Sequence, residues 1–175
     1  VSGKGTSAAF YMSKIQGFFR ALLASYVSPE ALLGNINRLA YDSMDDHSFM
    51  TLSMAVLDDR EHLLHVVRAS HPAGLHFRAS TGECHLSSPQ GIALALDKGE
   101  IFEKVLKRES LRLKPGDSFI MVSDGILEAE NADEEEYGEK RLQEAFCAAN
   151  GKSAEAIGES IIQSVNAFAG ACKQK

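Results

Sequence analysis

The stretch Asp117-Ser118-Phe119-Ile120-Met121-Val122-Ser123-Asp124-Gly125 joins an apolar run to an acidic residue and a glycine. The five apolar or small residues from Phe119 to Ser123 predict a buried central strand that ends by presenting the carboxylate of Asp124. Pro115-Gly116 is a turn signal that starts this strand, and Gly125 lets the chain leave Asp124 sharply. A carboxylate at the end of a strand is a position from which a sheet can bind a metal ion. The alternative is that Asp124 only caps the helix that follows, since Asp is favoured at that position.

Two helices are predicted at the start of the chain. Apolar residues recur at spacings of three and four from Ala8 to Tyr26, which indicates a well-buried helix capped by Thr6 or Ser7. A second helix is expected to begin at Pro29, with Ser28 as its cap.

Between these helices and the central strand the period of the pattern changes to two. Alternating residues predict a hairpin formed by strands over 50–56 and 62–69, followed by strands over 75–79 and 84–86. A charged segment over 102–113 is predicted to be a further strand, which forms a hairpin with the central strand through Pro115-Gly116.

Beyond Gly125 the chain is predicted to be helical again. One amphipathic helix carries Leu142, Ala145 and Phe146, and a final helix is capped by Ser153. Its inward residues are expected to be Ile157, Ile161, Val165 and Phe168. Helices that flank antiparallel strands indicate an α+β fold, and the lack of a repeat or a linker indicates one domain over residues 1–175.

Composition and charge exclude several classes of partner. The 175 residues are 45% hydrophobic and 24% charged, and 18 Lys and Arg against 24 Asp and Glu give a net charge of -6. Because no basic block occurs, nucleic acid and anionic membrane are not expected partners. No apolar run reaches the length of a membrane span, and no export signal opens the chain. The odd number of cysteines, Cys84, Cys147 and Cys172, favours reduced thiols and a cytoplasmic location.

Other groups with chemical potential are scattered. The histidines near strands, such as His65 and His76, are interpreted as solvated side chains, since a zinc site needs three or four convergent donors. The acidic cluster of Asp42, Asp45, Asp46 and His47 is interpreted as a solvated loop, with metal binding as the alternative. The run 133–136 is interpreted as exposed surface.

Five motifs in order carry a resemblance to a known family. They are Val1-Ser2-Gly3-Lys4-Gly5-Thr6-Ser7-Ala8-Ala9, Phe49-Met50-Thr51-Leu52, Ala69-Ser70-His71-Pro72, the pair Leu113-x-Pro115-Gly116-Asp117 and Val122-Ser123-Asp124-Gly125-Ile126-Leu127-Glu128-Ala129, and Tyr137-Gly138-Glu139-Lys140-Arg141-Leu142. Together they resemble the SpoIIE/RsbU-type branch of bacterial metal-dependent protein Ser/Thr phosphatases, the PPM superfamily. Arg68 and Ser70 depart from the family pattern, which usually has Asn and Gly there.

The resemblance implies an αββα sandwich of two antiparallel sheets flanked by helices, with two Mn²⁺ or Mg²⁺ ions between acidic residues. Asp124 matches one metal ligand of the family, the backbone carbonyl of Val1 matches another, and Lys4 is placed to contact phosphate. Other family aspartates would precede Val1 or follow Lys175, so the resemblance implies a phosphatase domain trimmed at both ends. In the complete domain the two ions activate a water that attacks phosphorus.

The implied substrate is a phosphoserine or phosphothreonine on a regulatory protein, typically an anti-sigma-factor antagonist of the STAS type, in bacterial stress or developmental signalling. An upstream sensor domain is expected, and unpaired strand edges favour self-association, for example as a homodimer. The alternative from another functional class is a non-catalytic pseudophosphatase, a regulatory module that keeps the fold and binds the same partner.

Overall fold

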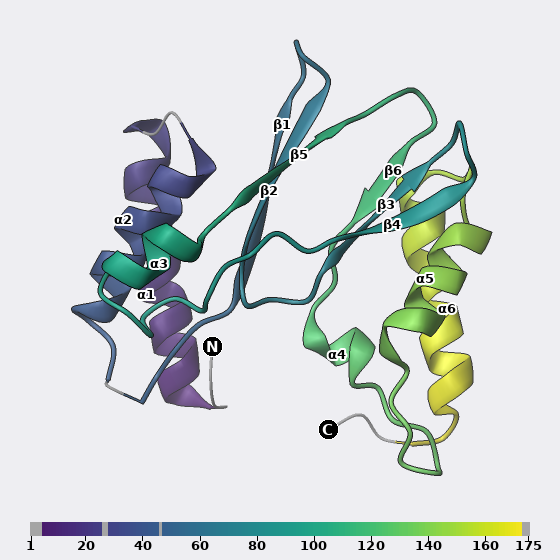
Figure 1. Ribbon diagram of the computed structural model, residues 1–175. Coiled ribbons are helices and arrows are strands. Elements are labelled where there is room, and N and C mark those ends of the chain that lie inside the picture. Colours follow the sequence, from purple (N-terminus) through teal and green to yellow (C-terminus); the bar gives the residue numbers. More distant parts are fainter. Residues whose placement is uncertain (1–4, 26–27, 46, 173–175) are drawn as a thin grey trace. The chain divides into compact units, whose positions relative to one another are not determined.

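The computed structural model describes residues 5–25, 28–45 and 47–172 and divides the chain into two compact units. Unit 1 contains residues 1–71 and 88–112, and unit 2 contains residues 72–87 and 113–175. Each unit has one three-stranded antiparallel sheet, its own helices and its own apolar core (Figure 1). No helix among the described residues has both the length and the apolar character needed to cross a bilayer.

Unit 1 begins with two helices. Helix α1 covers Thr6–Leu22 and continues into the short 3₁₀ helix η1, Leu23–Ser25. Helix α2 covers Pro29–Tyr41, with Pro29 at the first helical position and the Ser28 hydroxyl accepting the Ala31 N–H at 3.2 Å. This cap confirms the predicted start of the second helix, because Ser and Pro favour these two positions for local reasons.

The prediction that the first helix is well buried was wrong. Only Ile15 of α1 is fully buried, and the side chains of Phe10 and Met12 are 64% and 59% exposed. The apolar residues lie around more of the helix circumference than unit 1 covers. The spacing of apolar residues therefore predicted the helix but overestimated the width of its buried face.

The sheet of unit 1 has the strand order β1-β2-β5. Strand β1, Leu52–Asp58, pairs with β2, Leu63–Ala69, as the predicted hairpin, and β5, Arg108–Arg112, pairs with the other edge of β2. The apolar core of unit 1 contains residues of α1, α2, β2 and the segment before β5. They include Ile15, Leu33, Ile36, Val67, Leu94 and Phe102.

The prediction of one strand over 102–113 was wrong in two respects. The segment begins as helix α3, Glu100–Val105, and only Arg108–Arg112 forms a strand. Strand β5 pairs with β2, so it forms no hairpin with the strand that follows Gly116. The turn residues were identified, but a turn does not decide whether the strands on its two sides pair with each other.

The two residues that depart from the family pattern lie in β2 and directly after it. The guanidinium of Arg68 donates to the carbonyl oxygens of Pro89 at 3.2 Å and His71 at 2.8 Å. Ser70 has φ of 50°, a left-handed conformation that glycine adopts without steric cost. A Cβ at Gly91 would collide with the carbonyl oxygen of Arg68, so this position requires glycine.

Unit 2 contains the sheet β4-β3-β6 and three helices. Strand β3, Gly74–Arg78, pairs on one side with β4, Glu83–Ser87, and on the other with β6, Ser118–Ile120. Helix α4 covers Asp124–Leu127, α5 covers Gly138–Ala148, and α6 covers Ala154–Ala169. The Ser153 hydroxyl caps α6 by accepting the Ala156 N–H, as predicted. The core of unit 2 includes Leu75, Leu142, Phe146, Ile157, Ile161 and Val165, with Phe168 packed against it.

The prediction of a buried central strand over 119–123 was also wrong. Strand β6 is shorter, its residues are half-buried, and it pairs only with β3 among the described residues. The apolar composition of the segment indicated a strand, but composition does not show how many neighbours a strand has.

The cysteines differ from the expectation of three reduced thiols. Cys84 and Cys147 form a disulfide within unit 2, and Cys172 is free. The odd number of cysteines therefore did not indicate their pairing, because 63 positions separate the two partners in the chain.

Candidate functional site

The candidate site is built around Asp124, which begins helix α4 four residues after the end of β6. Its side chain is exposed, and its Oδ1 accepts the N–H of the neighbouring Gly125 at 3.0 Å. No other polar partner of this carboxylate lies within reach in the part of the chain that the structure describes. Asp124 is therefore a carboxylate with free acceptor capacity at the end of a strand.

Asp117, at the opposite end of β6, is in a contrasting environment. Its side chain is only 3% exposed, and its two oxygens accept the N–H groups of Ala79 at 2.9 Å and Lys114 at 3.0 Å. Burial acts to raise the pKa of the Asp117 carboxyl, and these hydrogen bonds together with His76 outweigh it, so that the pKa lies below its usual range. The acceptor capacity of Asp117 is used within the fold, whereas that of Asp124 is not.

His76 lies beside Asp117 and is 1% exposed, with its Nε2 3.4 Å from Asp117 Oδ2. Its Nδ1 is buried without a hydrogen-bond partner among the described residues. The interpretation of His76 as a solvated strand residue was therefore wrong. The alternation of residues along the strand did not predict the burial of His76. His76 lies beside Asp117 because β3 pairs with β6, with His76 opposite Phe119.

An acidic loop follows the candidate site. After α4 the chain forms an isolated bridge between Glu130 and Glu136, and Asn131 Oδ1 accepts the N–H groups of Asp133 and Glu135. Residues 132–136 are exposed, as predicted for the acidic run. Asn131 organises this loop, and its Nδ2 also donates to Glu135 Oε2 at 3.1 Å, so this carboxylate is held within the loop.

The remaining polar groups that the sequence singled out have local roles. His65 Nδ1 lies 2.8 Å from Ser110 Oγ, and His71 Nδ1 lies 3.0 Å from Thr51 Oγ1. In the loop after α2, Asp45 accepts a 2.6 Å hydrogen bond from the Tyr11 hydroxyl and Asp42 lies 3.0 Å from Lys98. Asp46 lies outside the described residues.

Of the predicted site residues, the structure describes only Asp124. The Val1 carbonyl and Lys4 lie outside the described residues. Within the described ranges, no group of three or more His, Cys, Asp or Glu side chains has the arrangement needed to hold a metal ion. The described residues therefore do not by themselves fit a two-ion centre, and Asp124 is the one predicted metal ligand among them.

Comparison with known proteins gives the class of this chain. The family Stage II sporulation protein E (SpoIIE) matches residues 1–175, and the chain belongs to this family, whose members are PP2C-type serine/threonine phosphatases. The resemblance found in the five sequence motifs is confirmed.

Particular relatives are distant. The chain is 24% identical over 166 residues to phosphoserine phosphatase RsbU of Bacillus subtilis, covering 93% of this chain and 48% of that protein, so it spans about half of the relative's length. The SiaA-PP2C domain of Pseudomonas aeruginosa matches 99% of this chain and 68% of its own, with a TM-score of 0.82 and 18% identity. The PP2C phosphatase domain of SpoIIE from Bacillus subtilis, solved with a fragment of its regulatory domain, matches 93% of this chain and 47% of its own, with a TM-score of 0.71 and 20% identity. These similarities confirm the predicted α+β phosphatase fold.

Proposed function

We propose that the protein is a metal-dependent phosphatase that hydrolyses phosphoserine or phosphothreonine on a regulatory protein. Membership of the SpoIIE family supports the reaction class. The similarity to a phosphoserine phosphatase supports phosphoserine as the preferred residue. The proposed substrate class is an anti-sigma-factor antagonist of the STAS type, within bacterial signalling, and an upstream sensor domain and a homodimeric state remain parts of the proposal.

The observation that carries the proposal is the availability of Asp124. Its carboxylate is exposed at the start of α4 and accepts only the N–H of its own neighbour among the described residues. Carboxylate oxygens are the ligands that Mg²⁺ and Mn²⁺ prefer, so Asp124 has the chemistry of a ligand for either ion. The Val1 carbonyl is the proposed second ligand in this sequence, and Lys4 is the proposed phosphate contact.

The experiment is a phosphatase assay of the full-length protein with p-nitrophenyl phosphate and with matched phosphoserine and phosphothreonine peptides. We expect hydrolysis with Mn²⁺ or Mg²⁺, loss of hydrolysis with EDTA, and recovery when the ion is returned. The phosphoserine peptide should be the better of the two peptides.

Two results would contradict the proposal in different ways. Hydrolysis that is unaffected by EDTA would contradict metal dependence. A folded protein that binds Mn²⁺ or a phosphopeptide but hydrolyses nothing would instead support the non-catalytic regulatory module.

A further inference from the structure

Strand β4 and helix α5 of unit 2 are joined covalently. Cys84 lies in β4 and Cys147 lies in the last turn of α5, and their Cα atoms are 6.3 Å apart. This separation is within the range that a disulfide spans without backbone movement. Both residues are half-buried, so the bond lies near the surface of unit 2, and α5 contacts β4 (Figure 1).

A second contact joins the same two elements at the same residue. Gln143 Nε2 donates to the carbonyl oxygen of Cys84 at 3.0 Å, and Gln143 precedes Cys147 by one helical turn. Strand β4 is at the edge of its sheet and pairs only with β3 among the described residues. One position of an edge strand is therefore held both by a hydrogen bond and by a covalent bond.

The fold does not require the covalent bond to bring the two sulfurs together. Cys84 packs against the apolar core that contains Leu142 and Phe146 of α5, and β4 keeps its ladder with β3. Because these contacts do not involve the disulfide, we expect the two thiols to stay neighbours when the bond is absent, so that it can form and break in the folded protein.

The candidate site lies, in the sequence, between the two cysteines of the cross-link. The 63-residue separation between the cysteines contains β6, α4 and Asp124. A disulfide stabilises a fold mainly by reducing the freedom of the unfolded chain, and the effect grows with the length of the loop that it closes. Oxidation should therefore stabilise the unit that presents Asp124.

We propose that Cys84 and Cys147 are a reversible redox clamp between β4 and α5. The oxidant is a low-molecular-weight disulfide such as oxidised glutathione. One thiolate attacks it to form a mixed disulfide and release one small thiol, and the second thiolate then attacks the mixed disulfide and releases the other. Two protons and two electrons leave the protein thiols, and two small thiols are formed. Excess small thiol or a dithiol reverses the reaction.

The test equilibrates the purified protein in glutathione buffers of graded potential, followed by differential alkylation and mass spectrometry of the peptides that contain Cys84, Cys147 and Cys172. We expect a Cys84–Cys147 cross-linked peptide that appears and disappears reversibly, while Cys172 forms no cross-link to either of them. Oxidation should raise the unfolding temperature of the wild type by about 4 to 16 °C and slow hydrogen exchange in residues 83–87. Cys147→Ser should remove this response, and the matched control Cys172→Ser should retain it.

Three outcomes would overturn the proposal. They are a Cys84–Cys147 pair that stays reduced in oxidised glutathione, a cross-link that a dithiol cannot open without unfolding the protein, and an oxidation response that persists in Cys147→Ser. None of these measurements depends on phosphatase activity, so the proposed function is tested separately.

Discussion

The two carboxylates that bracket β6 lie in opposite environments. Asp117 is buried and accepts two backbone N–H groups, whereas Asp124 is exposed and accepts only the N–H of Gly125 among the described residues. A buried carboxylate that accepts backbone N–H groups stabilises the fold, and an exposed one with free acceptor capacity can bind a ligand. Residue type and sequence position alone do not distinguish them.

For Asp117→Asn we expect a loss of about 1 to 3 kcal/mol in the free energy of unfolding at pH 7. Asparagine replaces one acceptor oxygen by an amide that faces the N–H of Ala79 or Lys114. Urea unfolding measures the loss. The exposed Asp133→Asn is the matched control and should change the unfolding free energy by less than about 0.5 kcal/mol.

The stabilisation that Asp117 provides should depend on pH. Because the pKa of the Asp117 carboxyl is lowered in the folded protein, its contribution to stability is present above the unfolded pKa of about 3.9 and is lost as the pH falls through the folded pKa. The difference in stability between wild type and Asp117→Asn should therefore shrink as the pH falls below about 4. A difference that grows on acidification would contradict this role.

For single residues, the sequence predicted features that are set by residues adjacent in the chain. Asp124 was predicted to be a metal ligand because an apolar run, Asp and Gly are consecutive, and this role stays a prediction. The pair His76 and Asp117 was missed because 41 positions separate its members and only the register of β3 with β6 brings them together. The disulfide was missed for the same reason.

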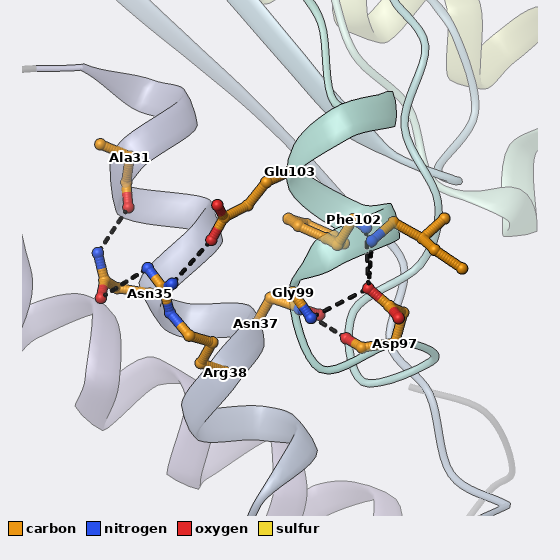
Figure 2. A network of polar contacts seen from close by, with 9 residues as sticks. Ala31, Asn35, Asn37, Arg38, Asp97, Gly99, Phe102 and Glu103 are labelled. Carbon is orange, nitrogen blue, oxygen red and sulfur yellow. Dashed lines mark hydrogen bonds and ion pairs between the residues drawn. The ribbon is translucent and has the colours of Figure 1, made fainter.

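At the scale of elements, a polar network fixes α3 to α2 (Figure 2). The fully buried Asn37 of α2 donates to the carbonyl oxygen of Asp97 at 2.8 Å and accepts the Ala95 N–H at 2.9 Å. Asp97 Oδ1 in turn accepts the N–H groups of Gly99, Ile101 and Phe102, which lowers the pKa of the Asp97 carboxyl. At the surface, Arg38 and Glu103 form an ion pair at 2.8 Å.

For Asn37→Ala we expect a loss of about 1 to 3 kcal/mol in the free energy of unfolding, because the half-buried N–H of Ala95 and carbonyl of Asp97 lose the hydrogen bonds of a fully buried side chain. The matched control is Asn35→Ala on the same helix, whose amide donates only to the Ala31 carbonyl and accepts from Arg38. Thermal or urea unfolding of both variants is the measurement. Equal losses in the two would show that the network does not stabilise the fold.

This network also explains why the sequence predicted α3 wrongly. Residues 102–113 are charged and partly alternating, which favoured a strand, while the turn that starts the helix is held by Asp97 and by Asn37, 60 positions earlier. In contrast, α2 and α6 were predicted with their caps, because Ser28 and Ser153 each bond an N–H three residues ahead.

For the whole molecule, the two units are interleaved in the chain. The chain passes between them after residues 71, 87 and 112, so neither unit is a continuous segment. The single domain over residues 1–175 stays a prediction. The fold class followed from the order of helices and strands, but the division of strands between two sheets did not, because the turn at Pro115-Gly116 joins β5 of one sheet to β6 of the other.

The central claim is that Asp124 serves chemistry while Asp117 serves stability. The most direct measurement compares kcat with Mn²⁺ for the full-length wild type, Asp124→Asn, Asp117→Asn and Asp133→Asn, together with the unfolding temperature of each. We predict that Asp124→Asn lowers kcat by roughly 100-fold or more and leaves the unfolding temperature unchanged. Loss of an outer-shell partner of a metal site can already cost roughly 100-fold, and a direct ligand should matter at least as much. Asp117→Asn should unfold at a lower temperature and keep its kcat per folded molecule, and Asp133→Asn should match the wild type. Full turnover in a folded Asp124→Asn variant would contradict the claim.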